Sequence, residues 1–378
     1  MLSSTKIELP GVSLATPKQV KEILHKSLKN IGKFENCALL DYPNHCNVGD
    51  HLIWLGEIFY LIDVLKTKIS YTASIGNFRA EKMEEQIGSA PIVLSGGGNL
   101  GDLWVQEQNF REKIISRYQD RPIIILPQTV YFSEPENLRK AAKIFNSHPD
   151  LTLFVRCHQS YKMASEYFYN CRVFMAPDMA FQLVGMPGLQ WQEQQKKSIL
   201  FLCREDKELN PEFEADYIGV DNITAEDWAA FRYKHPMPKI WTIPGMIRVA
   251  SEARKQGNLL PREWISRQLW KYFHPYTDKF DHIENSELQR KSWNFMHHAV
   301  YQFSQYDLVI TNRLHGHILC LILGVPHVFL PNAYYKNEYF YESWTSQIPF
   351  CRFVKSAAQI RPALQDLLEA KGSLSTMY

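Results

Sequence analysis

Short apolar runs alternate with helical segments through the first half of this 378-residue chain, and this alternation constrains the fold more than any other feature. The runs with the length of a buried strand are Cys37–Leu40, Ile69–Thr72, Ile92–Leu94, Ile123–Leu126, Leu151–Val155 and Val173–Met175. Strands that are regularly separated by helices are typical of βαβ units on a parallel sheet. The sequence therefore predicts an α/β fold, with ligands bound where the strands end.

Helical patterns fill the spaces between these strands. The first helix has the clearest start, because Thr16 suits an N-cap and Pro17 suits the first helical position. The helices predicted in the first half are Lys18–Lys29, Leu52–Leu65, Ala80–Ile87, Phe110–Tyr118, Pro135–Asn146 and Ser160–Tyr169. Those predicted later are Ala225–Phe231, Met246–Lys255, Arg262–Tyr272, Ser286–Gln302, Gly316–Leu323 and Ala357–Ala370.

The length of the chain favours two domains over a single core. Gly185–Lys197 is polar, begins with Gly and Pro, and has the composition of a linker. A new apolar strand, Ile199–Leu202, follows it. We therefore predict an N-terminal domain over residues 1–185, a C-terminal domain over 198–356, and a final helix and tail over 357–378.

A strand–helix–strand unit in the second domain has polar residues at its centre. Leu308–Ile310 and Val328–Leu330 have strand length, and the compact apolar helix Gly316–Leu323 lies between them. The polar segment Asn312–His317 stands at the junction of the first strand and the helix. A helix N-terminus offers free N–H groups and the positive end of a dipole, and Arg313 adds a charge. This junction is predicted to bind a phosphate or a carboxylate.

Composition excludes several classes of protein. The net charge of +2 argues against a dedicated nucleic-acid-binding protein or a polybasic membrane protein. The 7 cysteines are scattered and form no CxxC pair, so reduced thiols in the cytoplasm are the simplest interpretation and zinc is not expected. The N-terminus lacks a signal-peptide pattern and no apolar stretch has membrane-spanning length, so the protein is predicted to be soluble and cytoplasmic.

Two loops that follow strands combine glycine with polar side chains. They are Asn44–Asp50 and Ser95–Asp102, and neither is a strict GxGxxG or Walker motif. Their glycines would let the backbone approach a ligand, and the polar side chains there are Asn47, Asp50, Asn99 and Asp102. The alternative is a pair of tight turns capped by Asn and Asp.

Charged residues also stand directly after apolar strands. Arg156 and Arg204 either extend from the end of the sheet into solvent or point into a cleft, where a guanidinium matches phosphate and carboxylate. Asp178 is either a cap or a general base. His315 lies beside Arg313 and is interpreted as an acid–base group or a phosphate ligand, and Lys336 as a possible neighbour in the same cleft. We expect His317 to be structural.

Together these segments resemble the polysaccharide pyruvyl transferase family. The resemblance runs in order from about residue 37 to 345. It rests on Asn47–Asp50, Ser95–Asp102, Pro127–Thr129, Arg156 before Ser160, Pro177–Phe181, Arg204, Arg313–His315, and Tyr334–Lys336 before Phe340. Residues 210–286 carry no motif of the family, and Pro331–Ala333 stands where relatives often have Asp-Asn-Ser.

The resemblance implies two Rossmann-like domains that face each other across a cleft, similar to the GT-B arrangement of glycosyltransferases. The implied reaction moves the pyruvyl group of phosphoenolpyruvate onto two hydroxyls of a sugar in an exopolysaccharide or its lipid-linked precursor. It forms a pyruvate ketal, releases phosphate and needs no cofactor or metal. Peripheral association with a membrane is compatible with a lipid-linked acceptor.

The same resemblance assigns roles to residues in both predicted domains. The second domain is the phosphoenolpyruvate side, and the first is the acceptor side. The predicted donor-binding residues are Arg156, Arg204, Arg313, His315 and Lys336. The predicted acceptor-binding residues are Asn47, Asp50, Gly97, Gly98, Asn99 and Asp102. His315 is the predicted general acid, with Arg313 and Asp178 as the other catalytic residues and Asp178 or Asp50 as the base.

Two alternatives share this fold. One is a GT-B glycosyltransferase that uses a nucleotide sugar, in which Arg313 would hold the diphosphate. The other is a non-catalytic protein that binds a sugar or a phosphate. The sequence does not specify the acceptor sugar, the ketal positions or the oligomeric state.

Overall fold

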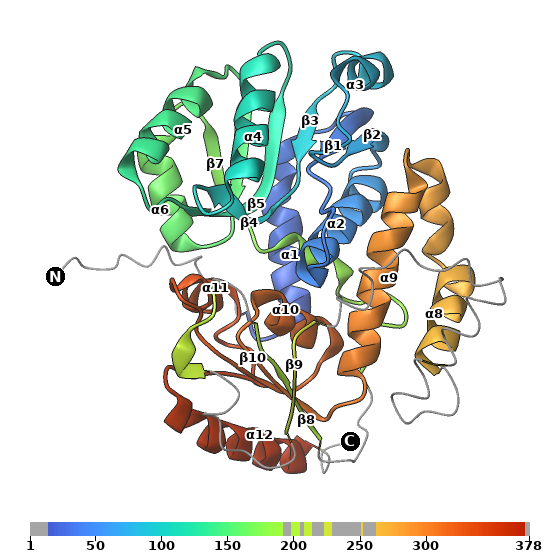
Figure 1. Cartoon of the computed structure of the whole chain (residues 1–378), viewed down its shortest axis with the longest axis vertical. Coiled ribbons are helices and arrows are strands. Elements are labelled where there is room, and N and C mark those ends of the chain that lie inside the picture. Colours follow the sequence, from blue (N-terminus) through green and yellow to red (C-terminus); the bar gives the residue numbers. More distant parts are fainter. Residues whose placement is uncertain are drawn as a thin grey trace.

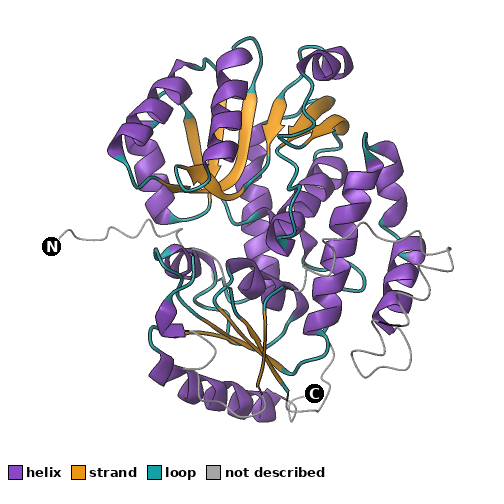
Figure 2. Cartoon of the chain, viewed as in Figure 1, coloured by secondary structure: helices purple, strands orange, loops and turns teal. Residues whose placement is uncertain are grey.

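The protein contains two parallel β-sheets, each with helices packed around it (Figures 1 and 2). This arrangement is seen in a computed structural model, which describes residues 14–191, 198–204, 208–213, 223–228, 251 and 262–374. Every strand pair within these ranges is parallel. The α/β class predicted from the alternating pattern is confirmed.

The first sheet has seven strands. They are β1 (Asn36–Leu40), β2 (Lys68–Ala73), β3 (Ile92–Leu94), β4 (Gly97–Gly101), β5 (Ile123–Tyr131), β6 (Leu151–Val155) and β7 (Arg172–Met175). Their order is β2-β1-β3-β5-β6-β7, with β4 paired to β5. The order reverses between β1 and β3, and a crevice opens at such a switch point in doubly wound sheets.

Helices cover both faces of this sheet (Figure 2). They are α1 (Pro17–Leu28), α2 (Val48–Phe59), α3 (Ala80–Ile87), α4 (Val105–Arg117), α5 (Pro135–Ser147) and α6 (His158–Tyr167). The predicted start of α1 is confirmed, because Thr16 and Gln19 form a capping box and Pro17 occupies the first turn. Helix α2 begins at Val48, four residues before the predicted start, because Asn47 caps it by accepting a hydrogen bond from Gly49 N.

The second sheet repeats the topology of the first with five strands. They are β8 (Ile199–Leu202), β9 (Ile223–Glu226), β10 (Leu308–Thr311), β11 (His327–Phe329) and β12 (Cys351–Phe353), in the order β12-β11-β10-β8-β9. Its helices are α8 (Arg262–Phe273), α9 (Ser286–Phe303), α10 (Leu314–Leu323), α11 (Lys336–Trp344) and α12 (Ile360–Leu374). The order reverses between β8 and β10, so this sheet has a switch point of its own.

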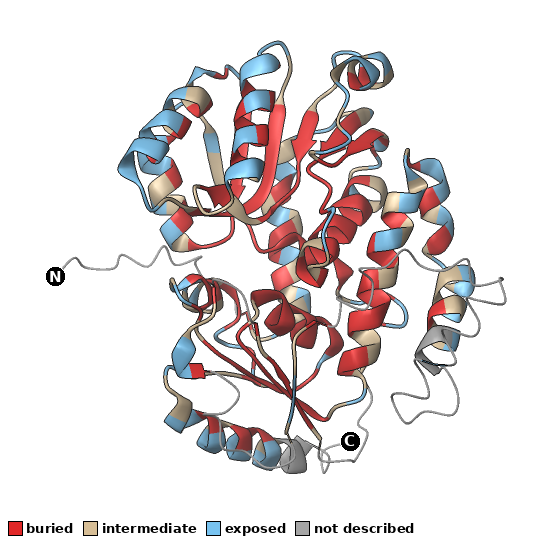
Figure 3. Ribbon diagram, viewed as in Figure 1, coloured by how far each residue is buried: buried red, intermediate tan, exposed pale blue. Residues whose placement is uncertain are grey.

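One apolar cluster connects the two sheets. It runs from Leu24 of α1 and Leu52 of α2 through Phe181 to Leu200 of β8 and Ile318 of α10. Helix α9 follows β8 and β9 in the chain but packs against α2 of the first half. Figure 3 shows the result, with buried residues continuous from the upper sheet through the central helices to the lower sheet.

Several sequence predictions need correction. Gly97–Gly101, predicted as a loop, forms strand β4, and β5 continues through Pro127, Gln128 and Thr129 because the glycine-rich segment pairs with it. The predicted helix Ala225–Phe231 is wrong at its start, where strand β9 pairs with β8, and its residues 229–231 lie outside the described ranges. The predicted helix Met246–Lys255 also lies outside them, apart from Ser251. The pattern missed β12 and α11 as well.

The predicted domain limits of 1–185, 198–356 and 357–378 stay a prediction. The first sheet falls within the first range and the second sheet within the second. Across the described ranges, no helix is both long enough and apolar enough to span a bilayer.

Candidate functional site

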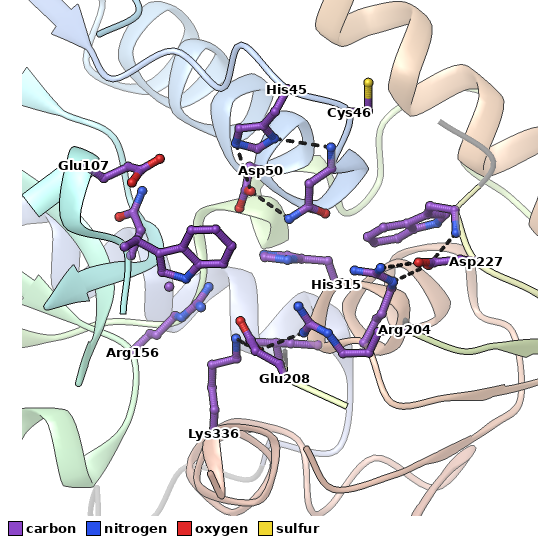
Figure 4. Close-up of a pocket in the computed structure, with 17 residues that line it drawn as sticks. His45, Cys46, Asp50, Glu107, Arg156, Arg204, Glu208, Asp227, His315 and Lys336 are labelled. Carbon is purple, nitrogen blue, oxygen red and sulfur yellow. Dashed lines mark hydrogen bonds and ion pairs between the residues drawn. The ribbon is translucent and has the colours of Figure 1, made fainter. Parts of the chain in front are cut away.

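A cavity of about 360 Å³ lies between the carboxyl ends of the two sheets (Figure 4). Its walls come from both halves of the chain. Residues of the first half are His45, Cys46, Asn47, Asp50, Gly98, Asn99, Trp104, Glu107 and Arg156. Residues of the second half are Arg204, Glu208, Asp227, Trp228, Arg313, Leu314, His315 and Lys336.

The two switch points explain why these residues meet. Asn47 and Asp50 follow β1, and Gly98 and Asn99 lie in β4, shortly after β3, so both segments flank the crevice of the first sheet. Arg204 follows β8 and Arg313 follows β10, so they flank the crevice of the second sheet. The cavity forms where the two crevices face each other.

Lys336 and Arg204 share one buried carboxylate. Lys336 Nζ lies 2.6 Å from Glu208 Oε2, and Arg204 Nη1 lies 2.9 Å from the same oxygen. Burial opposes ionisation of Glu208, but Lys336 and Arg204 outweigh it and lower the pKa of that carboxyl to about 2. Burial lowers the pKa of Lys336 to about 8, although the Glu208 charge acts in the opposite direction. Two cations with one anion leave this wall net positive.

A second network lies beneath His315. Arg156 donates to Thr129 Oγ1 at 2.8 Å and to Asp178, and Ala180 N donates to Asp178 Oδ1 at 2.9 Å. Burial opposes ionisation of Asp178, but Arg156 and His315 hold the pKa of its carboxyl well below the usual range. His315 Nε2 lies 3.4 Å from Asp178 Oδ2, so a fixed negative charge faces the imidazole.

The His315 ring packs directly on the first turn of α2. A Cβ added at Gly49 would lie 2.2 Å from His315 Nδ1 and 2.7 Å from its Cβ, much closer than van der Waals contact. Glycine at this position therefore makes room for a side chain from the other half of the protein. From the sequence, the glycines of this loop were expected to admit a ligand.

Arg313 is held by Asp227, which directly follows β9. Its Nε and Nη2 atoms lie 2.5 Å from the two oxygens of Asp227, in a bidentate pair. Its guanidinium also lies 5.5 Å from the centroid of the Trp228 ring. Asp227 fixes the guanidinium plane at the edge of the cavity and neutralises part of its charge.

The opposite wall carries carboxylates and amides. Asn47 Nδ2 donates to Asp50 Oδ2 at 2.7 Å, and His45 Nε2 lies 3.5 Å from the same oxygen. Asn99 Oδ1 accepts hydrogen bonds from Arg111 Nη2 at 2.9 Å and from Gln128 Nε2 at 3.0 Å. Both loops are thus held by their own polar contacts while their side chains border the cavity.

The glycine segment brings backbone close to the cationic wall. A Cβ at Gly98 would lie 2.9 Å from Arg156 Nη2 and 3.5 Å from Lys336 Nζ. Gly98 therefore lies between two predicted donor-binding cations, although it was predicted on the acceptor side.

Three predicted site residues are absent from the cavity walls. Gly97 lies behind them, near Ile53, and Asp178 lies beneath His315. Asp102 accepts hydrogen bonds from Ser133 N at 2.8 Å and Glu134 N at 2.8 Å, and so holds the segment that starts α5.

Other lining residues had weaker signals in the sequence. Glu208 lies four residues after Arg204 but was not singled out. Asp227 lies within residues 210–286, which carry no family motif, and only the fold brings it beside Arg313. His45 was inside the predicted loop Asn44–Asp50 but was not singled out. The feature that could have identified His45 is its short distance in sequence from Asp50, within the same loop.

A separate buried cluster has the composition of a metal site. The ligand atoms of His317, His327 and Cys351 lie within 4.8 Å of one another. His317 Nδ1 lies 2.7 Å from His327 Nε2, and the outer nitrogens contact Thr345 Oγ1 at 3.0 Å and Val325 O at 2.9 Å. These hydrogen bonds pair every ring nitrogen, so the two histidines account for their own burial without an ion.

Fold and site together define an α/β protein with a cavity at the carboxyl ends of two parallel sheets, lined among the described residues by four cations and four carboxylates. Residues 47–334 match the model of the family described as polysaccharide pyruvyl transferase. The chain belongs to the polysaccharide pyruvyl transferase family.

Individual relatives agree with this assignment. EpsO of Bacillus subtilis, described as a candidate pyruvyl transferase, is 30% identical over 344 residues, which cover 90% of this chain and 95% of EpsO. Pyruvyl transferase 1 of Schizosaccharomyces pombe is 26% identical over 310 residues, which cover 78% of this chain and 66% of that protein. The crystal structure of an uncharacterized protein from Klebsiella pneumoniae matches with a TM-score of 0.52 and 19% identity, over 89% of this chain and 99% of that one. The last comparison shows a shared fold.

Proposed function

We propose that this protein transfers the pyruvyl group of phosphoenolpyruvate to a sugar of a polysaccharide or of its lipid-linked precursor and releases phosphate. The observation that carries the proposal is the convergence of Arg156, Arg204, Arg313 and Lys336 with His315 on one cavity. Phosphoenolpyruvate carries a phosphate and a carboxylate, which match guanidinium and ammonium groups. The start of α10 adds backbone N–H groups beside Arg313.

The chemistry needs a proton donor beside the bound anion. His315 in its protonated form gives a proton to the methylene carbon of phosphoenolpyruvate, and the carbon that bears the phosphate becomes oxocarbenium-like. Asp178 stabilises the imidazolium that donates, because its carboxylate lies 3.4 Å from Nε2. A positioned acid of this kind typically contributes ~10²–10⁴-fold to the rate.

Two sugar hydroxyls then complete the ketal. The first hydroxyl attacks the cationic carbon and loses its proton to a base. The second attacks the same carbon while phosphate leaves. One hydroxyl proton replaces the proton taken from His315, and the other leaves with phosphate, so the reaction balances without a cofactor.

Asp50 is the base that the geometry favours. Asp178 and Asp50 were both predicted for this role, but Asp178 is fully buried and paired with Arg156. Asp50 borders the cavity and accepts one hydrogen bond, from Asn47 Nδ2 to Oδ2. A carboxylate at the wall can reach an acceptor hydroxyl, whereas one beneath His315 acts through that histidine.

The wider setting follows from the same proposal. The two sheets would face each other as in GT-B glycosyltransferases, with phosphoenolpyruvate against the second and the acceptor against the first. The enzyme would work in the cytoplasm, at the inner face of the membrane when the acceptor is lipid-linked.

Phosphate release is the direct test. Purified protein is incubated with an acceptor glycan and, in separate reactions, with phosphoenolpyruvate or with nucleotide sugars. Acceptor-dependent phosphate release and a ketal methyl signal in the NMR spectrum of the glycan are expected with phosphoenolpyruvate. His315→Gln should abolish both, while His282→Gln, an exposed histidine, should abolish neither. Turnover with nucleotide sugars alone would reject the proposal.

A further inference from the structure

A second cavity of about 300 Å³ adjoins the first. It is lined by the loops after β1, β2 and β3 and by the first turn of α4. Four residues line both cavities: His45, Asp50, Asn99 and Glu107. The two cavities therefore adjoin at these side chains, and each is of the size that holds a small ligand, ~300–1,000 Å³.

The two cavities differ in charge. The first combines the four cations that suit phosphoenolpyruvate with four carboxylates, those of Asp50, Glu107, Glu208 and Asp227. The second is lined by the carboxylates of Asp41, Asp50 and Glu107, and within the described part of the chain no lysine or arginine lines it. Phosphoenolpyruvate and other anions are repelled from such a space.

The floor of the second cavity is a fixed polar surface. Asp41 ends β1 with a left-handed backbone, φ 72°, and its carboxylate lies 3.6 Å from the buried Arg111 guanidinium. A backbone strained in this way at a sheet edge persists only where its surroundings enforce it. Burial raises the pKa of Asp41 to about 6, although Arg111 acts in the opposite direction.

Several of the remaining lining residues carry neutral hydrogen-bonding side chains. They include Asn44, Ser74, Ser95 and Gln106. Carboxylates, amides and hydroxyls together pair with ligand hydroxyls in both directions, as donors and as acceptors. A polyhydroxylated, uncharged ligand fits this set.

We propose that the second cavity binds the sugar unit next to the one that receives pyruvate, so that the acceptor is a glycan of at least two units with a neutral or amino sugar in this position. The inference rests on the proposed function for the place of the first sugar. Asp50 and His45 stand where the two units join. A single sugar fills only the cavity beside His315, whereas a longer glycan gains contacts in both.

Chain length is the variable to test first. The probes are methyl glycosides of glucose, galactose, mannose and N-acetylglucosamine, each compared with its matching methyl disaccharide. For the sugar that is pyruvylated, kcat/KM is expected to be at least about tenfold higher for the disaccharide, the gain expected from one further well-placed ligand group. Equal values for the two lengths would overturn the inference.

A substitution that fills the second cavity tests whether the higher kcat/KM of the disaccharide arises there. Gly76 lines the cavity, and a Cβ added there meets no heavy atom within 4 Å, so a side chain at this position starts without a clash. Gly76→Trp should bring the disaccharide down to the value of the monosaccharide and leave the monosaccharide unchanged, and Gly76→Ala should leave both unchanged. Asn44→Trp repeats the test from the loop after β1. An equal loss with both acceptors would contradict the inference.

A binding measurement tests this inference independently of the proposed function. If no acceptor supports phosphate release from phosphoenolpyruvate, the proposed function fails and the cavity is tested by saturation-transfer NMR. Contact of the second unit of a neutral disaccharide in the wild type, lost in Gly76→Trp, would support a glycan subsite. A signal that the tryptophan does not change would overturn it.

Discussion

Replacing Gly49 with alanine should displace the His315 ring and slow the reaction. The added Cβ would lie 2.2 Å from His315 Nδ1, and ordinary contact begins at 3.4 Å, so the two must separate by about 1.2 Å (3.4 − 2.2). The nearest atoms include the Cβ of His315, at 2.7 Å, so rotation of the ring alone does not relieve the contact. The imidazole then leaves its position 3.4 Å from Asp178.

The size of the effect follows from that displacement. A misplacement of ~1 Å can reduce catalysis by ~10²-fold. We therefore expect kcat for phosphate release to fall about 100-fold, equivalent to ~2.7 kcal/mol of transition-state stabilisation. Steady-state phosphate release with saturating phosphoenolpyruvate and acceptor measures it.

A double-mutant cycle separates this contact from a general effect on folding. Alanine is favoured over glycine within helices by ~1 kcal/mol, so Gly49→Ala is not destabilising through helix propensity. In the His315→Ala background the contact is gone, and Gly49→Ala should leave the free energy of unfolding unchanged or raised. In the wild-type background it should lower that free energy.

Urea unfolding of the four proteins gives the coupling between the two positions. The same loss of stability in both backgrounds, or a wild-type kcat in Gly49→Ala, would refute the reasoning. The stability arm needs no substrate, so it tests the packing of His315 on α2 whether or not the proposed reaction is correct.

Three further results are expected. Because burial lowers the pKa of Lys336 to about 8 while Glu208 raises it, kcat/KM for phosphoenolpyruvate should fall as pH rises through about 8, and Glu208→Gln should move that fall to lower pH. If the pH profile of kcat/KM is the same in Glu208→Gln as in the wild type, the pairing of Lys336 with Glu208 is contradicted. Asp178→Asn leaves Arg156 buried without its carboxylate, so urea unfolding should show a loss of about 3–5 kcal/mol. In the wild type the Asp178 contribution is complete above the unfolded pKa of ~3.9 and is lost as pH falls toward the lower folded pKa, so this group should not make stability change with pH near neutrality. Asp102→Ala removes hydrogen bonds at the start of α5 and should cost about 1 kcal/mol in the same assay with an unchanged acceptor KM; a raised KM would support the acceptor role predicted from the sequence.

The sequence predicted the parts of the site that follow apolar strands. Arg204 and Arg313 were found because each stands directly after a run of strand length, and parallel strands bring their carboxyl ends to one edge. Of the strands that were missed, β9 and β12 are short and only partly buried, so their apolar pattern is weak, and β4 is rich in glycine and was predicted as a loop.

The sequence could not be used to predict which charged residues pair with one another. Glu208 lies four residues after Arg204, but Lys336 reaches the same carboxylate from 128 residues further along the chain. The glycine at position 49 was visible, but its reason lies in a histidine from the other half of the fold. Contacts of this kind depend on how the two sheets face each other, which no local pattern encodes.

The apolar cluster that joins the two sheets has a consequence for how substrates enter. Enzymes with two lobes often close over their substrates by rotation about a hinge. Here α2, α9 and α10 pack together between the sheets, so a rotation that separated them would uncover apolar surface at ~2.5 kcal/mol for each 100 Å². Separation of these helices is therefore opposed, so substrate entry is expected to leave this contact between the two halves intact.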